Sequence, residues 1–478
     1  MSAVKSRNIV ILGASGNLAL TKLLPSLYTL YTSGAMPQNF SIIGYSRTAM
    51  PDEKFREIVL ENLKSNVEET ALEATLVENF LTKLYYCSGQ YDSTEDFEKL
   101  KGRLEEVSEL YPIRPRTLYY LSTPPSVFEP VANALKESGL VTKGEDSLEN
   151  VIVEKPFGYD TDSAKVLNEK LYETFDEKQI YRIDHYLGKE AIQNLLVLRF
   201  ANIIFEPVWN RNYIESVMIS WEEDKHIGSR GGYFDESGII RDVIQNHLLQ
   251  ILSLVAMEQP TSLSSSSICT EKIKALKCIK PVTLDDTVIG QYTDGVCAGK
   301  SVIGYTKEDS VPDESKRDTY AMIKCDIDNH RWSGVPFYLR AGKALTKSST
   351  EIIINFKEVP GNIFKDSPHG SNKLVIRVQP DAGKLFHITN KVPGKGMVLK
   401  DVKFDFTYNE SFNQTMPGAY ERLLLDAING DKTLFISYEE LIHSWEIFTP
   451  ILKKIDKGEA PVHYYAAGTA GPEESEKL

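Results

Sequence analysis

Residues 8–19 of the chain read Asn8-Ile-Val-Ile-Leu-Gly-Ala-Ser-Gly-Asn-Leu-Ala19. The apolar run before the first glycine predicts a buried parallel strand, because such strands are covered on both faces. Beyond the glycines, leucines recur with helical spacing up to about Tyr31, and Asn17 is a residue type that caps helices. Strand, glycine-bearing turn and helix in this order predict a dinucleotide-binding unit.

The turn itself has the residue types that a pyrophosphate requires. The first glycine permits a tight turn, the second lets the backbone approach the pyrophosphate, and Ala19 keeps the helix close to the sheet. The helix start adds free N–H groups and the positive end of its dipole. A glycine pattern alone is common, but its place between strand and helix supports this interpretation. We therefore expect cofactor contacts from Gly13, Ala14, Ser15, Gly16, Asn17 and Leu18.

The end of the second expected strand, residues 41–44, indicates which dinucleotide binds. NAD-selective folds usually place an acid here to bind the ribose hydroxyls. This chain instead has Gly44-Tyr-Ser-Arg47, and a guanidinium suits a 2′-phosphate. The pattern favours NADP over NAD, with Arg47 as the contact. The alternative is that Arg47 is an ordinary surface arginine.

The rest of the chain divides into two patterns. Up to about residue 180, short apolar strands alternate with helices, which predicts a doubly wound, Rossmann-like α/β domain over residues 1–180. After about residue 200, alternating strands without regular helices between them predict an α+β domain with a large, mostly antiparallel sheet, residues 181–478, for substrate binding and dimerisation. The expected strands are 84–87, 118–121, 151–153, 216–220, 350–355, 373–377 and 402–406, the helices are 94–110, 241–256 and 419–429, and the serine run 264–267 is expected to be a loop.

Composition excludes several classes of protein. The chain has 478 residues, 42% hydrophobic and 25% charged, as in an ordinary globular protein of two or three domains. A net charge of −13 argues against a nucleic-acid binder. No secretory signal and no membrane span are expected, and cytoplasm is the default location. Five widely spaced cysteines without a Cys-x-x-Cys pair predict neither disulfides nor a metal site.

The segment Arg182-Ile-Asp-His-Tyr-Leu-Gly-Lys-Glu190 concentrates chemically active side chains. Burying such charges without partners is costly, so a packed core has little use for them. A site for a phosphorylated, hydroxylated small molecule suits them better. Lys189 and His185 can neutralise phosphate, Tyr186 can donate to it, and Asp184 can hold a second imidazole in place.

Three further segments complete a family resemblance. They are Glu154-Lys-Pro-Phe-Gly158 at the end of a strand, Gly231-Gly-Tyr-Phe-Asp-Glu-Ser-Gly-Ile-Ile-Arg-Asp-Val-Ile-Gln-Asn-His247, and Leu339-Arg-Ala-Gly-Lys343. Together with residues 182–190, they resemble the glucose-6-phosphate dehydrogenase family from Gly13 to about Pro450.

The resemblance implies a reaction and a role for each residue. His247 would be the general base that takes the proton from the sugar's anomeric hydroxyl, and Asp184 would orient it and stabilise the imidazolium. Hydride would pass from C1 to NADP, giving a lactone. An imidazole near neutral pKa suits this task, and a neighbouring carboxylate raises its basicity. Glucose 6-phosphate would be held by Lys155, His185, Tyr186, Lys189, Glu223, Asp242 and Lys343, with Lys155 also at the cofactor.

Some positions depart from the family pattern. Asn17 stands where the family usually has Asp, and the charged turn after Glu223 replaces an apolar one, which puts the role of Glu223 in doubt. Some members bind a second, structural NADP. Arg377 matches one of its contacts, but His387 stands where those members have Lys, so we expect no such site. The family's association through the large sheet leads us to expect a homodimer or homotetramer.

Two other functions stay open at this stage. One is a related sugar dehydrogenase that acts on an unphosphorylated sugar, against which His185, Tyr186 and Lys189 argue. The other is a non-catalytic paralogue that binds the sugar phosphate or NADP. A lone helix histidine is more often a core residue than a base, and it is the family motif that favours catalysis for His247.

Overall fold

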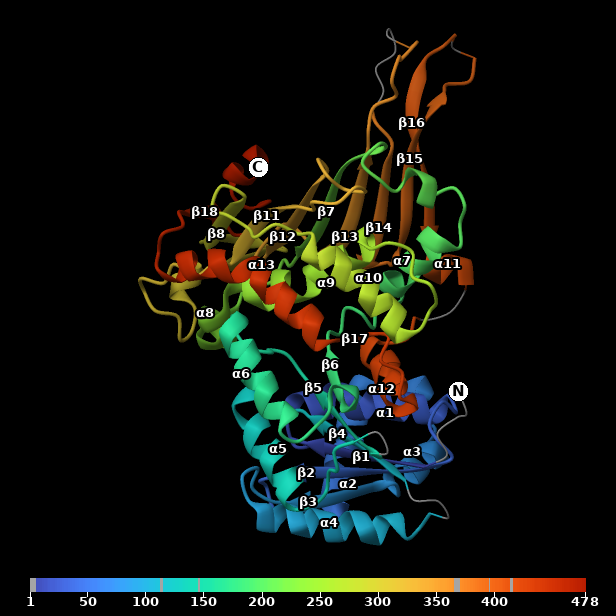
Figure 1. The fold of residues 1–478 in the computed structure, drawn as a ribbon, viewed down its shortest axis with the longest axis vertical. Helices are drawn as coiled ribbons and strands as arrows, with labels where there is room; N and C mark the ends of the chain where they lie inside the picture. Colours follow the sequence, from blue (N-terminus) through green and yellow to red (C-terminus); the bar gives the residue numbers. More distant parts are fainter. Residues whose placement is uncertain (1–5, 112–114, 145–146, 365–369, 395, 413–415) are drawn as a thin grey trace.

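The computed structural model describes residues 6–111, 115–144, 147–364, 370–394, 396–412 and 416–478. Two sheets organise the chain. Figure 1 shows them in opposite halves of the molecule, with helices α9 (Leu249–Ala256), α10 (Ser265–Lys277) and α13 (Tyr438–Asp456) on the side of the large sheet that faces the first sheet. The site described below lies where these halves meet.

The first sheet is the expected doubly wound one. Its strand order is β17-β6-β5-β4-β1-β2-β3, and all its pairs are parallel except β17 with β6. The order reverses at β1, so the glycine turn lies at the switch point where such sheets bind ligands. The strands are β1 (Ser6–Leu12), β2 (Asn39–Ser46), β3 (Leu84–Ser88), β4 (Arg116–Leu121), β5 (Glu149–Val153), β6 (Ile180–Ile183) and β17 (Phe435–Ile436), and the helices between them are α1 (Leu24–Thr32), α2 (Asp52–Asn66), α3 (Ala74–Leu81), α4 (Thr94–Ser108), α5 (Phe128–Glu137) and α6 (Thr161–Tyr172).

The first helix starts earlier than its sequence indicates. The backbone N–H of Leu20 donates to the carbonyl of Gly16 at 3.1 Å, so Gly16 occupies the cap position and Asn17 lies in the first turn. The prediction that Asn17 caps this helix is therefore wrong. Because the Gly16 carbonyl accepts the first helical bond, the helix begins one residue before the side chain that was expected to cap it. It runs as a short π-helix over Ala19–Leu23 before α1 begins.

The large sheet is mostly antiparallel, as expected. Its order is β16-β15-β14-β13-β7-β12-β11-β8-β18, with parallel pairs only at β7–β12 and β8–β18. The central strands are covered, and Ile219, Leu339 and Ile352 are fully buried. The strands are β7 (Ile214–Glu222), β8 (Thr287–Thr293), β11 (Tyr320–Asp326), β12 (Pro336–Gly342), β13 (Ser349–Phe356), β14 (Lys373–Gln379), β15 (Gly383–Lys391), β16 (Leu399–Thr407) and β18 (Val462–Ala466), with β9 (Gly295–Cys297) and β10 (Lys300–Val302) as a separate pair.

One expectation about the helices of this half needs correction. The serine run is not a loop, because α10 begins at Ser265 and the Ser264 side chain caps it by accepting from the Ser267 N–H. Serine is a strong cap residue, and the apolar residues that follow pack inward. The expected helix 241–256 is confirmed as one helical stretch, which begins as the π-helix η7 (Ile240–Leu248) and continues as α9. The helix 419–429 is α12, Ala419–Asn429.

The late part of the chain returns to the first sheet. Strand β17 pairs with β6, and the buried Arg7 donates to the carbonyls of Ala427 and Ile428 in α12 at 2.8 and 2.6 Å. Strand β6 begins at Ile180 and β17 lies near the end of the chain, yet both belong to the first sheet. The two halves therefore interlock, and the division at 180/181 stays a prediction. In the described residues, no helix is long and apolar enough to cross a membrane.

Candidate active site

A carboxylate–imidazole pair forms the centre of the site. Asp184 follows β6, and His247 lies on η7, which packs against β7 and β12 of the large sheet. His247 Nδ1 is 2.6 Å from Asp184 Oδ1, and the exposed fractions of the two residues are 3% and 2%. The backbone N–H of Tyr186 donates to the same Oδ1 at 2.9 Å. Two segments 63 residues apart therefore meet, as the sequence predicts.

Burial and charge act in opposite directions on this pair. Burial alone would raise the pKa of Asp184, but His247 beside it lowers that pKa to about 2, so the carboxylate stays ionised. Burial lowers the pKa of His247 below its usual value, against the opposing effect of Asp184. The imidazole is therefore neutral near pH 7, the state that a proton acceptor needs.

Lys155 fixes which imidazole nitrogen carries the proton. Its Nζ lies 3.0 Å from His247 Nε2, 2.8 Å from the Asp242 carbonyl oxygen and 3.1 Å from Asp242 Oδ1. Lysine nitrogen can only donate, so Nε2 accepts and Nδ1 must carry the proton toward Asp184. Burial opposes ionisation of Asp242, but Lys155 and Lys343 lower its pKa to about 2. The Nε2 lone pair therefore points to Lys155 Nζ, and Nε2 is the nitrogen that can accept a proton.

The expected phosphate-binding residues lie beside this pair. The ring of His185 is 4.7 Å from that of His247, and burial together with His247 lowers the pKa of His185 well below its usual value. Lys189 Nζ donates to Gln379 Oε1 at 2.7 Å, and burial lowers its pKa. The ring of Tyr420, from α12, stacks parallel to His185 at 6.2 Å.

Among the described residues, three side chains contact the Tyr186 hydroxyl. Trp221 Nε1 donates to its hydroxyl at 2.6 Å and Gln379 Nε2 at 3.2 Å, while Thr350 Oγ1 lies 3.4 Å away. Burial raises the pKa of Tyr186 to about 12. Two donors occupy the oxygen, so its own hydrogen is left to donate. Sequence reasoning missed Trp221 and Gln379, which no local motif signals because they come from other strands.

Lys343 and Glu223 form an ion pair at the ends of neighbouring strands. Lys343 Nζ lies 2.7 Å from Glu223 Oε2 and 4.5 Å from the centroid of the Trp221 ring. The Trp221 indole also donates to the Tyr186 hydroxyl. It therefore connects the Lys343–Glu223 ion pair to the expected phosphate-binding residues. The ion pair gives Glu223 a defined place despite the charged turn that follows it.

The glycine turn has the shape that its sequence predicts. Gly13 adopts φ +92°, and a Cβ there would lie 2.4 Å from the Ser122 carbonyl oxygen, so only glycine fits. Ala14 is buried, whereas Ser15 and Asn17 are exposed and Gly16 and Leu18 are half-buried. The turn therefore offers small and exposed groups at the carboxyl end of β1, as a pyrophosphate site needs.

Arg47 stands at the end of β2 with an exposed side chain. Its guanidinium lies 5.9 Å from the centre of the Tyr91 ring. Such a pair can stack an adenine between the guanidinium and the ring, and the guanidinium can bind a phosphate. Tyr91 was not singled out from the sequence, because nothing near it repeats the glycine pattern.

One cluster has the composition of a metal site. Asp184, His185 and His247 have ligand atoms that all lie within 4.8 Å of one another. The Asp184–His247 contact has the length of a hydrogen bond, with Nδ1 as its donor, so the atoms that would bind an ion bind each other. The expectation of no metal stays a prediction.

A cavity of about 430 Å³ lies beside Lys155, the lysine that contacts His247. Lys155 and Asp242 form part of its wall, and it extends past the segment 155–159 that follows β5 toward α6 and α13. Apolar side chains line most of the remainder, including Phe157, Leu167 and Trp445. A planar apolar group could enter beside Lys155, next to the base.

The fold and this site define a class, that of oxidoreductases that use a nicotinamide dinucleotide. Residues 10–194 match the family model "Glucose-6-phosphate dehydrogenase, NAD binding domain", and residues 196–478 match "Glucose-6-phosphate dehydrogenase, C-terminal domain". The chain belongs to the glucose-6-phosphate dehydrogenase family.

Relatives and solved structures agree over nearly the full length. The chain is 45% identical to glucose-6-phosphate 1-dehydrogenase 1, chloroplastic, of Arabidopsis thaliana, over 97% of this chain and 81% of that protein. It is 44% identical to the glucose-6-phosphate 1-dehydrogenase of Aggregatibacter actinomycetemcomitans, over 98% and 95%. A solved glucose-6-phosphate dehydrogenase in complex with glucose-6-phosphate is 39% identical with a TM-score of 0.93, covering 100% of this chain and 98% of that one.

Proposed function

We propose that this chain oxidises C1 of glucose 6-phosphate to 6-phosphogluconolactone with NADP as hydride acceptor, the first oxidative step of the pentose phosphate pathway. One observation carries the proposal: a buried His247 donates from Nδ1 to Asp184 at 2.6 Å and presents Nε2 to the cleft beside Lys155. That arrangement is the one required to remove a hydroxyl proton as a C–H bond breaks.

The sugar's anomeric hydroxyl would replace Lys155 Nζ at His247 Nε2. The proton then moves to Nε2, and the ionised Asp184 stabilises the imidazolium that forms. Lys155 keeps the carboxylate and carbonyl of Asp242 as partners, so it can turn toward a sugar oxygen without losing every contact. NADP, when bound, supplies the hydride acceptor.

The rest of the substrate would be bound by groups that already have defined positions. We propose that Lys189 and His185 contact the phosphate and that Tyr186 donates its remaining hydrogen to it. Asp242, Glu223 and Lys343 are proposed to bind the sugar hydroxyls. Binding energy from the remote phosphate then serves to align C1 with the acceptor.

We also propose contacts for the cofactor. It would lie along the carboxyl ends of β1, β2 and β5, at Gly13, Ala14, Ser15, Gly16, Asn17, Leu18, Arg47 and Lys155. The Ser122 carbonyl, which leaves no room for a Cβ at Gly13, supports a tightly fixed turn at this position. The exposed Arg47 supports NADP over NAD. A homodimer or homotetramer in the cytoplasm is also proposed, without nucleic-acid or membrane partners. Curated relatives include both chloroplastic and cytoplasmic forms.

An initial-rate assay tests the proposal. The absorbance of reduced nicotinamide is followed with NADP or NAD and with glucose 6-phosphate or glucose. We expect turnover with the phosphorylated sugar and preference for NADP. Comparable turnover of glucose would favour a different sugar dehydrogenase, and no turnover with any pair would favour a non-catalytic paralogue. Sedimentation of the purified chain tests the oligomeric state.

A further inference from the structure

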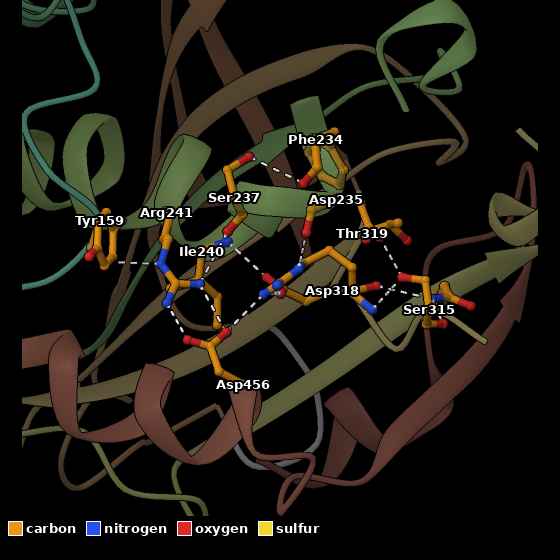
Figure 2. A network of polar contacts seen from close by, with 12 residues as sticks. Tyr159, Phe234, Asp235, Ser237, Ile240, Arg241, Ser315, Asp318, Thr319 and Asp456 are labelled. Atoms are coloured by element: carbon orange, nitrogen blue, oxygen red, sulfur yellow. Dashed lines mark hydrogen bonds and ion pairs between the residues drawn. The ribbon is translucent and has the colours of Figure 1, made fainter. Parts of the chain in front are cut away.

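A network of arginines and carboxylates lies at the start of η7, outside the residues that we place at the substrate (Figure 2). Arg241 Nη2 lies 2.6 Å from Asp456 Oδ2 at the end of α13, and Arg241 Nε donates to the Tyr159 carbonyl at 2.9 Å. Arg317 Nη1 donates to Asp456 Oδ1 at 3.0 Å. We call Arg241, Arg317 and Asp456 the arginine clamp.

Asp318, in the same network, caps η7, which has no capping side chain of its own. Gly238 adopts φ +71°, which separates the preceding helix α8 (Gly231–Ile239) from η7. Asp318 accepts from the Ile240 N–H through Oδ2 at 3.0 Å and from the Ile239 N–H through its carbonyl at 2.9 Å. A carboxylate at this end of a helix satisfies free N–H groups and favours the dipole. A loop far along the chain therefore fixes where η7 begins.

Three groups of proposed site residues are attached to this network. The Tyr159 carbonyl, which accepts from Arg241, belongs to the segment that carries Lys155. Helix η7 carries Arg241 together with Asp242 and His247. Next to Asp318, the Thr319 carbonyl accepts from the Lys343 N–H at 2.9 Å. The clamp thus joins the segment after β5 to the helix that bears the base, with Lys343 held beside them.

We propose that Arg241 and Asp456 are positioning residues that set the separation between Lys155 and His247. This proposal rests on the function proposed above. Lys155 can orient the Nε2 lone pair only while its segment is held against η7, and the Arg241–Tyr159 contact holds it there. Small displacements of reacting groups reduce rates strongly, so the clamp acts on catalysis while touching no substrate atom.

We expect the arginine clamp to affect the positions of Lys155 and His247 more than the stability of the fold. The Asp456 side chain is 40% exposed, whereas that of Arg241 is only 8% exposed. Asp456→Asn keeps an oxygen that can accept from Arg241, so we expect it to lower stability only modestly. The effect of the clamp on His247 is transmitted through Lys155. Five charged or titratable groups of the described residues face His247. They are Asp184, His185 and Tyr186 after β6, Lys155 after β5, and Asp242 on η7 itself. Of these, only Lys155 and Asp242 adjoin segments that the clamp holds.

The test compares two clamp variants with a matched control. Asp456→Asn keeps the shape of the side chain and removes the charge shared by both guanidinium groups, and Arg241→Lys keeps the charge but cannot bridge Tyr159 and Asp456 together. Asp456→Glu is the conservative rescue. Asp162→Asn is the control, because Asp162 also links α6 to α13 through Lys453 at 3.5 Å but lies on the surface away from η7.

We expect Asp456→Asn and Arg241→Lys to lower kcat/KM for glucose 6-phosphate about fivefold. We also expect the acid limb of kcat/KM to move to higher pH, because Lys155 lowers the pKa of His247 and its withdrawal releases that effect. Asp456→Glu should recover most of the change, with thermal unfolding close to that of the unmodified chain throughout.

Several results would overturn the proposal. An unchanged kcat/KM and pH profile in both variants would do so, as would equal changes in Asp162→Asn. A lower kcat/KM that comes with early unfolding and an unmoved pH profile would assign the clamp a structural role only. Absence of turnover in the unmodified chain would reject the proposed function itself, and the positioning role with it.

Discussion

The glycine turn and the Asp184–His247 pair are built on different principles. The turn offers backbone and small groups, and the side chains of Ser15 in the turn and of Arg47 after β2 are exposed. The proposed catalytic centre consists of buried groups that already contact each other, with Asp184 and His247 only 2% and 3% exposed. Buried charges depend on their partners, whereas exposed ones act singly. Substitutions should therefore have large, coupled effects in the centre and small, separable effects at the cofactor.

The largest effect is expected from His247→Asn. Asparagine can still face Asp184 and Lys155 but cannot take the proton, so kcat should fall about 10³-fold while the KM for glucose 6-phosphate changes little. His226→Asn is the matched control, because His226 Nδ1 also contacts a carboxylate, that of Glu308 at 2.7 Å, outside the centre. Initial rates decide the matter, and unchanged turnover in His247→Asn would refute its role as base.

Asp184→Asn should have the next largest effect. Without the carboxylate, the imidazolium loses the charge that stabilises it, so kcat should fall about 10²-fold. In the unmodified chain, burial lowers the pKa of His247 from 6.5, so activity should be lost only as pH falls below that value. Asp184 raises that pKa, and its removal should move the acid limb to still lower pH. A limb that moves upward in a pH series of kcat/KM would contradict this pairing.

The same contrast explains what the sequence could predict. The strands of the first sheet and helix 419–429 follow from local periodicity, and the Asp184–His247 contact follows from the family resemblance. The donors to Tyr186 could not be predicted, because Trp221 and Gln379 lie 35 and 193 residues away and belong to an ordinary strand pattern.

Capping shows the limit of local patterns. Asn17 is a residue type that caps helices, but the helix begins one residue earlier, with Gly16 at the cap position. At η7 no local side chain forms a cap, and Asp318 from a distant loop provides one. Capping signals in a sequence report only on local side chains, so a cap from a distant loop could not be predicted.

A smaller effect is expected at the phosphate-binding end of the centre. Lys189→Ala removes a charged donor, and the KM for glucose 6-phosphate should rise about 30-fold. Lys384→Ala is the control, because burial also lowers the pKa of Lys384, which donates to Asn194 instead. Isothermal titration with the sugar phosphate should show the same loss of affinity. Equal affinity in both variants would remove Lys189 from the site.

The smallest effect is expected at the turn end of the comparison, from Arg47→Ala. An exposed guanidinium contributes one interaction with a 2′-phosphate, so the KM for NADP should rise about tenfold while that for NAD and the kcat stay unchanged. Arg56→Ala is the matched control, because Arg56 lies 6.0 Å over the Tyr85 ring much as Arg47 lies over Tyr91. Initial rates with each cofactor measure both. Parallel losses with NADP and NAD would mean that Arg47 binds a part common to the two dinucleotides, and that the preference for NADP arises elsewhere in the turn.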